Sequence, residues 1–166
     1  SDQDMSKLTR LFIDAANERI EQLPRRLADL GVRYDRGREE DFVAELREMY
    51  ARYFAKHALR QKVARVDVRD ARILAVREDV LSSAVRGKMF RGVRRHGKHL
   101  FADAGKQWLH LHFGMSGDLA YYRDEADEPR FARVVFDFAN GAHLAFEDMR
   151  LFGVVDVTAS PDDYIS

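Results

Sequence analysis

The sequence has no cysteine and only three prolines among its 166 residues. Without thiols, the chain cannot form disulfide bonds, thiolate metal sites or a cysteine nucleophile. No apolar run approaches the roughly 20 residues that span a bilayer. The opening SDQDMSKLTR also lacks the pattern of a signal peptide. These absences predict a cytoplasmic protein without a membrane partner.

A net charge is absent as well, because 28 basic residues balance 28 acidic ones. The charges are unevenly distributed, however, and no Asp or Glu occurs from Val80 to Ala102. Six cations fall in that segment: Arg86, Lys88, Arg91, Arg94, Arg95 and Lys98. A local basic segment can bind phosphates in a neutral protein, because salt screens distant charges. A solvated surface would give the same pattern, so charge alone leaves both readings open.

Two amphipathic helices are predicted before residue 60. The first follows an apolar stripe from Leu8 to Leu30, with Ser6 as its N-cap. Pro24 is expected to kink this helix or begin a second one. The second covers residues 40–59, and its apolar and aromatic face consists of Phe42, Leu46, Met49, Tyr50, Tyr53, Phe54 and His57. Together they predict a helical hairpin whose apolar faces need a partner layer.

From Val63 onward the apolar period changes to two, which predicts short strands. The candidates are VARVDV, the run around Phe90 to Val93, HLFADA, WLHLHF, ARVVFDF, HLAFED and FGVVDV. Asn140-Gly141 predicts a hairpin with a type I′ turn. The predicted class is α+β, an antiparallel β-sandwich of short strands packed with an N-terminal helical hairpin.

Five of the six histidines lie between His96 and His143. His110 and His112 share one face of a predicted strand, a spacing that can ligate a metal. A half-exposed strand with Leu109 and Leu111 on its other face would show the same spacing, and no third ligand is identifiable. We therefore expect neither a metal site nor a cofactor.

Three other stretches carry side chains suited to nucleic acids. Gly92–Leu100 is a basic strand–turn–strand, and Gly114–Gly117 presents Met115 between two glycines. The run Glu147–Gly153 contains Arg150 and Phe152, which lie on the same side if the chain is extended there. Together they offer cations, a thioether and an aromatic ring.

These three stretches, and the order in which they follow one another along the chain, resemble the N-terminal domain of the formamidopyrimidine-DNA glycosylase and endonuclease VIII family. The matching runs are VARVDVRDARIL, FRGVRRHGKHLF, LHLHFGMSGDL, ARVVFDFANGAHLAFEDMRLFG and the closing DDYI. The resemblance covers about two thirds of the chain. It divides the chain into a helical extension of unknown relation, residues 1–41, and a glycosylase-like sandwich with its leading helix, residues 42–166.

The resemblance also implies residue roles. Met115, Arg150 and Phe152 would enter the duplex and fill the space left by a flipped nucleotide, and Lys98 would contact phosphates beside it. Arg94 and Arg95 would extend that basic contact. Leu151 stands where the family usually has a second arginine, so one phosphate contact is expected to be missing.

The family's chemistry needs a free N-terminal proline followed by glutamate. Phe42 and Val43 stand at the corresponding positions, and an internal amide nitrogen is not a nucleophile. The family's helix–two-turn–helix element and zinc finger have no counterpart in these residues. The resemblance therefore implies no catalytic residue, and ordinary glycosylase or AP lyase catalysis is not expected from this chain alone.

Three hypotheses remain open. The first is a DNA-binding module of base-excision repair that reads distorted or abasic double-stranded DNA. The second is an inert scaffold or interaction domain, arising from a natural fusion or an engineered or recombined chain, whose N-terminal helices bind a protein partner or a second copy. The third is a glycosylase with an unorthodox nucleophile. Exposure of Met115, Arg150 and Phe152 beside Lys98 would favour the first, and their coverage by the N-terminal helices the second.

Overall fold

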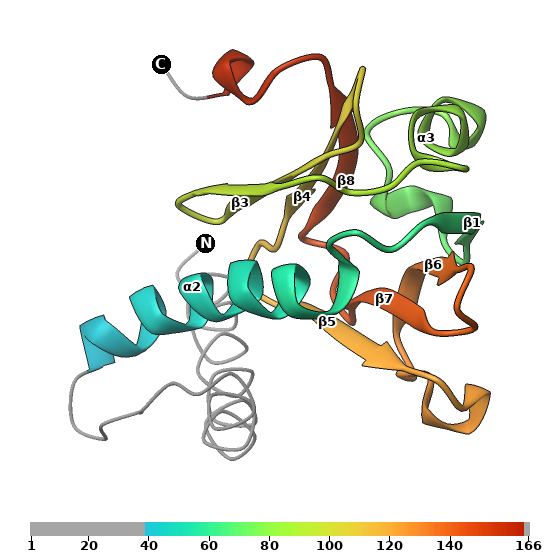
Figure 1. Ribbon diagram of the computed structural model, residues 1–166. Coiled ribbons are helices and arrows are strands. Elements are labelled where there is room, and N and C mark those ends of the chain that lie inside the picture. The colour runs from blue at the N-terminus through green and yellow to red at the C-terminus, as the bar shows by residue number, and fades with distance from the viewer. Residues whose placement is uncertain (1–38, 165–166) are drawn as a thin grey trace. The chain divides into compact units, whose positions relative to one another are not determined.

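The computed structural model describes residues 39–164, so the first predicted helix lies outside the described residues (Figure 1). The chain divides into two units, residues 1–49 and 50–166, and the described part of the first is helical. In the described part of the chain, no helix is both long and apolar enough to cross a bilayer. The domain boundary expected between residues 41 and 42 stays a prediction.

The second unit contains two four-stranded sheets, ordered β1-β6-β7-β5 and β2-β3-β4-β8, in which all neighbours are antiparallel. The elements are α2 (Glu39–Ala58), β1 (Val63–Val68), η1 (Ala71–Ile73), α3 (Glu78–Val85), β2 (Val93–His96), β3 (His99–Asp103), β4 (Trp108–His112), β5 (Gly117–Tyr122), η2 (Glu125–Asp127), β6 (Ala132–Phe138), β7 (His143–Asp148), β8 (Val154–Thr158) and η3 (Pro161–Asp163). The predicted α+β class and antiparallel sandwich are confirmed.

The last two turns of α2 pack on the sandwich because one face is apolar. Phe54 and Ala58, four residues apart, are fully buried, and the Phe54 ring meets Phe90 edge-on at 5.2 Å. The helix ends just before Arg60, whose φ of 65° lies in the left-handed region that often terminates helices.

The core between the sheets follows the two-residue period of the strands. Leu109 and Leu111 of β4 are fully buried, as are Leu144 and Phe146 of β7. The rings of Phe113 and Phe146 meet at 5.5 Å and join the end of β4 to the other sheet. The apolar alternation in the sequence therefore corresponds to the inner faces of the sandwich.

Three elements differ from the sequence expectation. Helix α3 was not predicted, because only Leu81 and Val85 form its buried face and eight residues are too few for a clear helical period. Strand β5 was also missed, since Gly117-Asp118 interrupts the apolar alternation. Strand β2 begins at Val93 and not around Phe90.

The hairpin predicted at Asn140-Gly141 is confirmed between β6 and β7, but its turn type is wrong. A type I′ turn needs positive φ at both residues, and only Gly141 has one, at 87°. The Asn140 side chain instead accepts a hydrogen bond from the Ala142 amide at 2.9 Å. Asparagine thus closes this turn with its side-chain oxygen.

Candidate nucleic-acid interface

Two chain crossovers lie side by side at one end of the sandwich. The turn 113–117 leads from β4 of one sheet to β5 of the other, and the loop 148–153 leads back from β7 to β8. His112 pairs with Val154 and Gly117 pairs with Asp148. Because both ends of one crossover are paired with both ends of the other, the two segments run next to each other.

The absence of side chains at two glycines lets the crossovers touch. Gly114 has a φ of 57°, and a Cβ there would lie 2.7 Å from the carbonyl oxygen of Phe152. A Cβ at Gly153 would lie 2.6 Å from the carbonyl oxygen of His112. Real Cβ atoms do not approach so closely, so only glycine permits this contact.

One buried carboxylate, that of Asp148, ties the two crossovers together. It accepts hydrogen bonds from the Ser116 hydroxyl, from the Arg150 amide at 3.2 Å and from the Gly153 amide at 2.7 Å. Asp148 is completely buried, and several donors make such burial of a carboxylate tolerable. Asp148 was not identified as a residue of the site from the sequence. The sequence could have identified Asp148 as a residue that holds the loop, because an aspartate before a short loop that ends in glycine often accepts hydrogen bonds from the backbone amides of that loop.

The three predicted wedge residues project from these crossovers. Phe152 is 44% exposed, Arg150 is exposed, and Met115 is half-buried. The stretch from Arg150 to Phe152 is not extended as supposed, because Leu151 has a left-handed φ of 59°. The structure nevertheless brings a thioether, a guanidinium and an aromatic ring to one end of the sandwich.

Aromatic residues from the last turns of α2 support the turn 113–117. The Tyr50 hydroxyl donates to the Gly117 carbonyl at 3.0 Å, and its ring stacks on Phe113 with centroids 4.1 Å apart. Farther along α2, the Tyr53 hydroxyl accepts a hydrogen bond from the Tyr121 amide at 2.7 Å. The turn is therefore fixed to the helix as well as to Asp148.

The predicted basic residues divide into two groups. Lys98 is half-buried in the β2–β3 turn, and its carbonyl accepts from the Phe113 amide at 3.3 Å, which places it beside the turn 113–117. Arg95 is exposed and donates to the Gly97 carbonyl at 3.1 Å. Arg94, also exposed, lies 3.9 Å from the Asp162 carboxylate. The structure thus joins the backbone of Lys98 to the crossovers, whereas Arg94 faces an acid.

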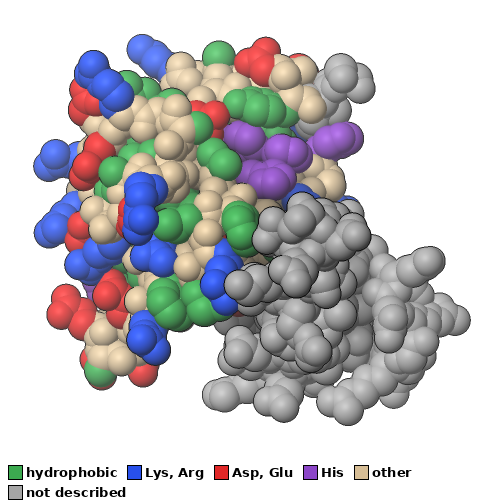
Figure 2. Space-filling model, turned by 180° about the vertical axis from the view of Figure 1, so that it is seen from behind, with side chains coloured by type: hydrophobic (Ala, Val, Ile, Leu, Met, Phe, Trp, Pro, Cys, Tyr) green, Lys and Arg blue, Asp and Glu red, His purple; other side chains and the backbone are tan. Residues whose placement is uncertain are grey.

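A histidine cluster, formed by His99, His110 and His112, lies next to Lys98 on the outer face of the β2-β3-β4-β8 sheet. Figure 2 shows a patch of histidine side chains on one face of the molecule. His99 Nδ1 and His110 Nε2 are 2.8 Å apart, and the His99 and His112 ring centroids are 4.6 Å apart. The His110 ring stacks on Phe101 at 4.7 Å and packs against Tyr164 at 4.3 Å. His110 is only 3% exposed, so the half-exposed strand expected here is wrong for this residue.

The surroundings of the histidine cluster keep it uncharged near neutral pH. Burial, and then the neighbouring His99, lower the pKa of His110 to about 4. Burial followed by Lys98 lowers the pKa of His112. Within residues 39–164, no group of three or more His, Cys, Asp or Glu side chains is arranged to hold a metal. The cluster therefore adds little positive charge to Lys98 at pH 7.

Comparison with known proteins gives a consistent family. The family described as "Formamidopyrimidine-DNA glycosylase N-terminal domain" matches residues 44–155. A formamidopyrimidine-DNA glycosylase of Streptococcus pyogenes is 28% identical over 101 residues, which cover 61% of this chain and 37% of that protein. The enzyme of Acidithiobacillus ferrooxidans is 33% identical over 101 residues, with the same coverage. The match thus spans little more than a third of the length of these curated relatives.

Solved structures agree on the fold. The Lactococcus lactis formamidopyrimidine-DNA glycosylase bound to DNA with an AP site superposes with a TM-score of 0.67 at 23% identity, covering 72% of this chain and 46% of that chain. The same enzyme in complex with DNA containing N7-benzyl-Fapy-dG gives a TM-score of 0.66, also at 23% identity, and covers 74% and 45%. At this identity the likeness shows a shared architecture.

Proposed function

Because this chain belongs to the formamidopyrimidine-DNA glycosylase N-terminal domain family, we propose that it binds double-stranded DNA and prefers distorted or abasic sites. The observation that carries the proposal is the contact between the two crossovers, where Gly114 lies against the Phe152 backbone. That contact brings the half-buried Met115 turn next to the exposed Arg150 and Phe152. A related glycosylase has been solved with DNA that contains an abasic site, which supports this substrate class.

The proposed mechanism of recognition is replacement of lost base stacking. An abasic site leaves a gap in the base stack, and the Met115 and Phe152 side chains fill it with apolar surface. The Arg150 guanidinium hydrogen-bonds the base that has lost its partner. Lys98, at the neighbouring turn, neutralises a phosphate of the kinked backbone, and Arg94 and Arg95 add weaker contacts.

The test is a fluorescence-anisotropy titration of duplexes with and without a central abasic analogue, across a salt series. We expect tighter binding to the abasic duplex and a salt dependence equivalent to a few phosphate contacts. Met115→Ala should reduce the preference about tenfold, since burying a methionine side chain as a wedge contributes roughly 1.5–3 kcal/mol. Met89→Ala is the matched control, because Met89 is another methionine, with an exposed side chain (47%), but lies in the segment before β2, outside the two crossovers. Equal, weak binding of both duplexes would overturn the proposal.

Catalysis by this chain alone is not part of the proposal. The family's attacking group is a secondary amine at a free N-terminus, and Phe42 occupies the corresponding position here. Borohydride reduction of the protein with abasic DNA should therefore yield no covalent adduct. A trapped adduct would establish an amine nucleophile and favour the glycosylase hypothesis.

The alternative is an inert scaffold whose N-terminal helices form an interface with a protein partner or a second copy. The first of those helices lies outside the described residues, so the alternative rests on the sequence alone. Equal, weak binding of the two duplexes, together with a concentration-dependent increase in molecular mass by light scattering, would favour it.

A further inference from the structure

Arg133 occupies an irregular position at the start of β6. Ala132 pairs with Glu147 and Val134 with Phe146, so Arg133 is the extra residue of a β-bulge. A bulge redirects a side chain away from the alternation of its strand, and bulges are frequent near functional sites. The side chain of Arg133 is only 18% exposed, which is low for an arginine at a sheet margin.

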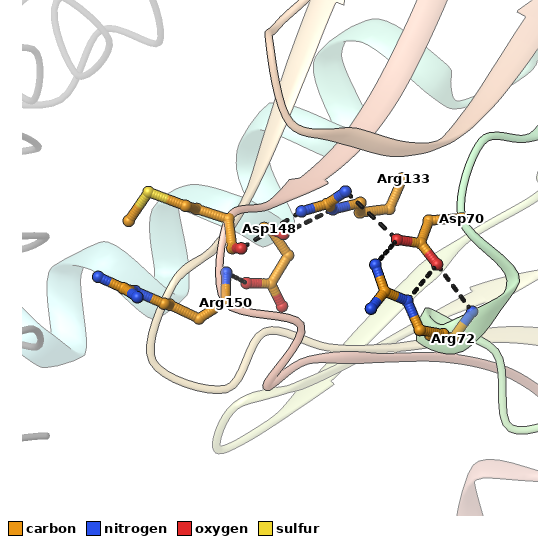
Figure 3. Close-up of polar contacts among 6 residues, drawn as sticks. Asp70, Arg72, Arg133, Asp148 and Arg150 are labelled. Carbon is orange, nitrogen blue, oxygen red and sulfur yellow. Dashed lines mark hydrogen bonds and ion pairs between the residues drawn. The ribbon is translucent and has the colours of Figure 1, made fainter.

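The redirected guanidinium holds the backbone of the loop 148–153. Its Nε donates to the Asp148 carbonyl at 2.8 Å and its Nη2 to the Met149 carbonyl at 3.3 Å. Figure 3 shows these two contacts and the Arg150 side chain extending away from them. Two donors of one planar group thus fix successive carbonyls directly before Arg150, a geometry that lysine cannot reproduce.

The third corner of the guanidinium is fixed by Asp70, which lies between β1 and η1. Arg133 Nη1 is 3.3 Å from Asp70 Oδ2, and the Arg133 carbonyl accepts from the amides of Arg69 and Asp70. Asp70 also accepts from the Arg72 side chain at 2.7 and 3.0 Å (Figure 3). Hydrogen bonding to Arg72 lowers the pKa of Asp70 to about 2, so it is a carboxylate at any pH of interest.

We propose that Arg133, oriented by Asp70, is a positioning residue that sets where Arg150 and Phe152 stand relative to Met115. It thereby determines the preference for abasic over intact duplex without contacting DNA. This inference rests on the proposed function, because the preference that Arg133 controls is the one proposed above. The physical reason is that Asp148 fixes the loop 148–153 from one side and Arg133 fixes its carbonyls from the other.

The main test replaces Arg133 by lysine, which keeps the charge and removes the forked geometry. We expect the ratio of abasic to intact affinity to fall about tenfold, since hydrogen bonds from a charged, forked donor are stronger than those of neutral groups. Affinity for intact duplex should change less than twofold. Arg130→Lys is the matched control, because Arg130 is exposed on the same segment and stacks on Phe131 at 5.2 Å.

A second variant, Asp70→Asn, removes the charge that orients the guanidinium and leaves β6 intact. It should lower the same ratio in the same direction. For each variant the melting temperature confirms folding, and amide hydrogen exchange at Arg150 and Gly153 reports the loop without any DNA. We expect faster exchange at both amides in Arg133→Lys and wild-type exchange in Arg130→Lys.

Each outcome decides between specific explanations. A retained ratio with wild-type exchange overturns the inference. Equal weakening on both duplexes in Arg133→Gln, with Arg133→Lys unaffected, would make Arg133 a phosphate contact and also overturn it. If wild-type protein does not discriminate between the duplexes, the proposed function fails and the role in lesion preference fails with it. Exchange at Arg150 and Gly153 then decides separately whether Arg133 holds the loop.

Discussion

The crossovers at Asp148 and the histidine cluster are neighbouring regions that bury polar groups in opposite ways. Both oxygens of Asp148 accept hydrogen bonds, from three donors in two segments. His110 is almost as deeply buried, yet its Nδ1 has no hydrogen-bond partner among the described residues and lies 4.0 Å from the Asp156 carboxylate. The satisfied carboxylate stabilises one backbone arrangement, whereas the buried imidazole resists protonation and therefore makes stability depend on pH.

Removing the satisfied group should have the largest effect. Asp148→Ala leaves the Ser116 hydroxyl and the Arg150 and Gly153 amides without their acceptor. Since each buried unpaired donor costs roughly 1–3 kcal/mol, we expect a loss of about 4 kcal/mol in the free energy of unfolding. Urea denaturation measures this loss, and Asp162→Ala, which alters an exposed acid, is the control. A loss below about 1 kcal/mol would show that the carboxylate does not hold the crossovers.

The pH dependence of stability should identify the unsatisfied group. The pKa of His110 is about 4 in the folded protein and 6.5 ordinarily, so the unfolded chain binds more protons between these values. Stability is therefore complete above about pH 6.5 and falls as the pH drops towards 4, by about 3 kcal/mol from this residue. Denaturation at a series of pH values measures the decline.

The variant His110→Phe tests whether His110 itself causes this decline. His110→Phe keeps the stacking on Phe101 and Tyr164 and removes the unpaired nitrogen. It also removes the contact between His110 Nε2 and His99 Nδ1, so we expect a change below about 1 kcal/mol at pH 7, and it should flatten the decline between pH 6.5 and 4. His96→Phe, at an exposed site on β2, should leave the decline as it is. An unchanged pH profile in His110→Phe would assign the decline to other groups.

A smaller effect is expected from separating the crossovers. Gly114→Ala places a Cβ 2.7 Å from the Phe152 carbonyl at a left-handed φ. We expect a loss of about 2 kcal/mol, because backbone strain and the close contact add. Gly141→Ala is the matched control, because its φ is also positive, 87°, but no atom lies within 4 Å of the added Cβ. Equal losses in the two variants would mean that the contact with Phe152 contributes nothing.

The smallest effect should come from the helix side of the same turn. Tyr50→Phe keeps the stack on Phe113 and removes the hydrogen bond to the Gly117 carbonyl. A loss of about 1 kcal/mol is expected by urea denaturation. A loss comparable to that of Asp148→Ala would show that α2 contributes as much as the carboxylate to the position of the turn.

Much of the fold was accessible from the sequence because it depends on local patterns. The alternation in VARVDV and ARVVFDF predicted β1 and β6 with the correct bounds, and Asn140-Gly141 predicted the hairpin. Helix α3 and strand β5 were missed where the pattern was short or interrupted. Tertiary contacts, and not a clear local period, determine those two elements.

The candidate site was predictable only in part. The stretches around Met115 and Arg150 were identified through a family resemblance, and their contact at Gly114 follows from the pairing of β4 with β8 and of β5 with β7. The residues that hold them were not predictable. Tyr50 and Gly117 are 67 residues apart, and Asp70 and Arg133 are 63 apart. Such contacts arise only from the assembled sheets.

The two crossovers, the turn 113–117 and the loop 148–153, also bear on the rates of folding and unfolding. The hairpins β2–β3, β3–β4 and β6–β7 join neighbours in sequence, so little loop-closure entropy opposes their formation. The contact between the turn 113–117 and the loop 148–153 requires the slower, long-range pairings of β4 with β8 and β5 with β7. We therefore expect the Asp148 hydrogen bonds to form late in folding. Substitutions among them should mainly accelerate unfolding and change the folding rate little, which stopped-flow kinetics would measure.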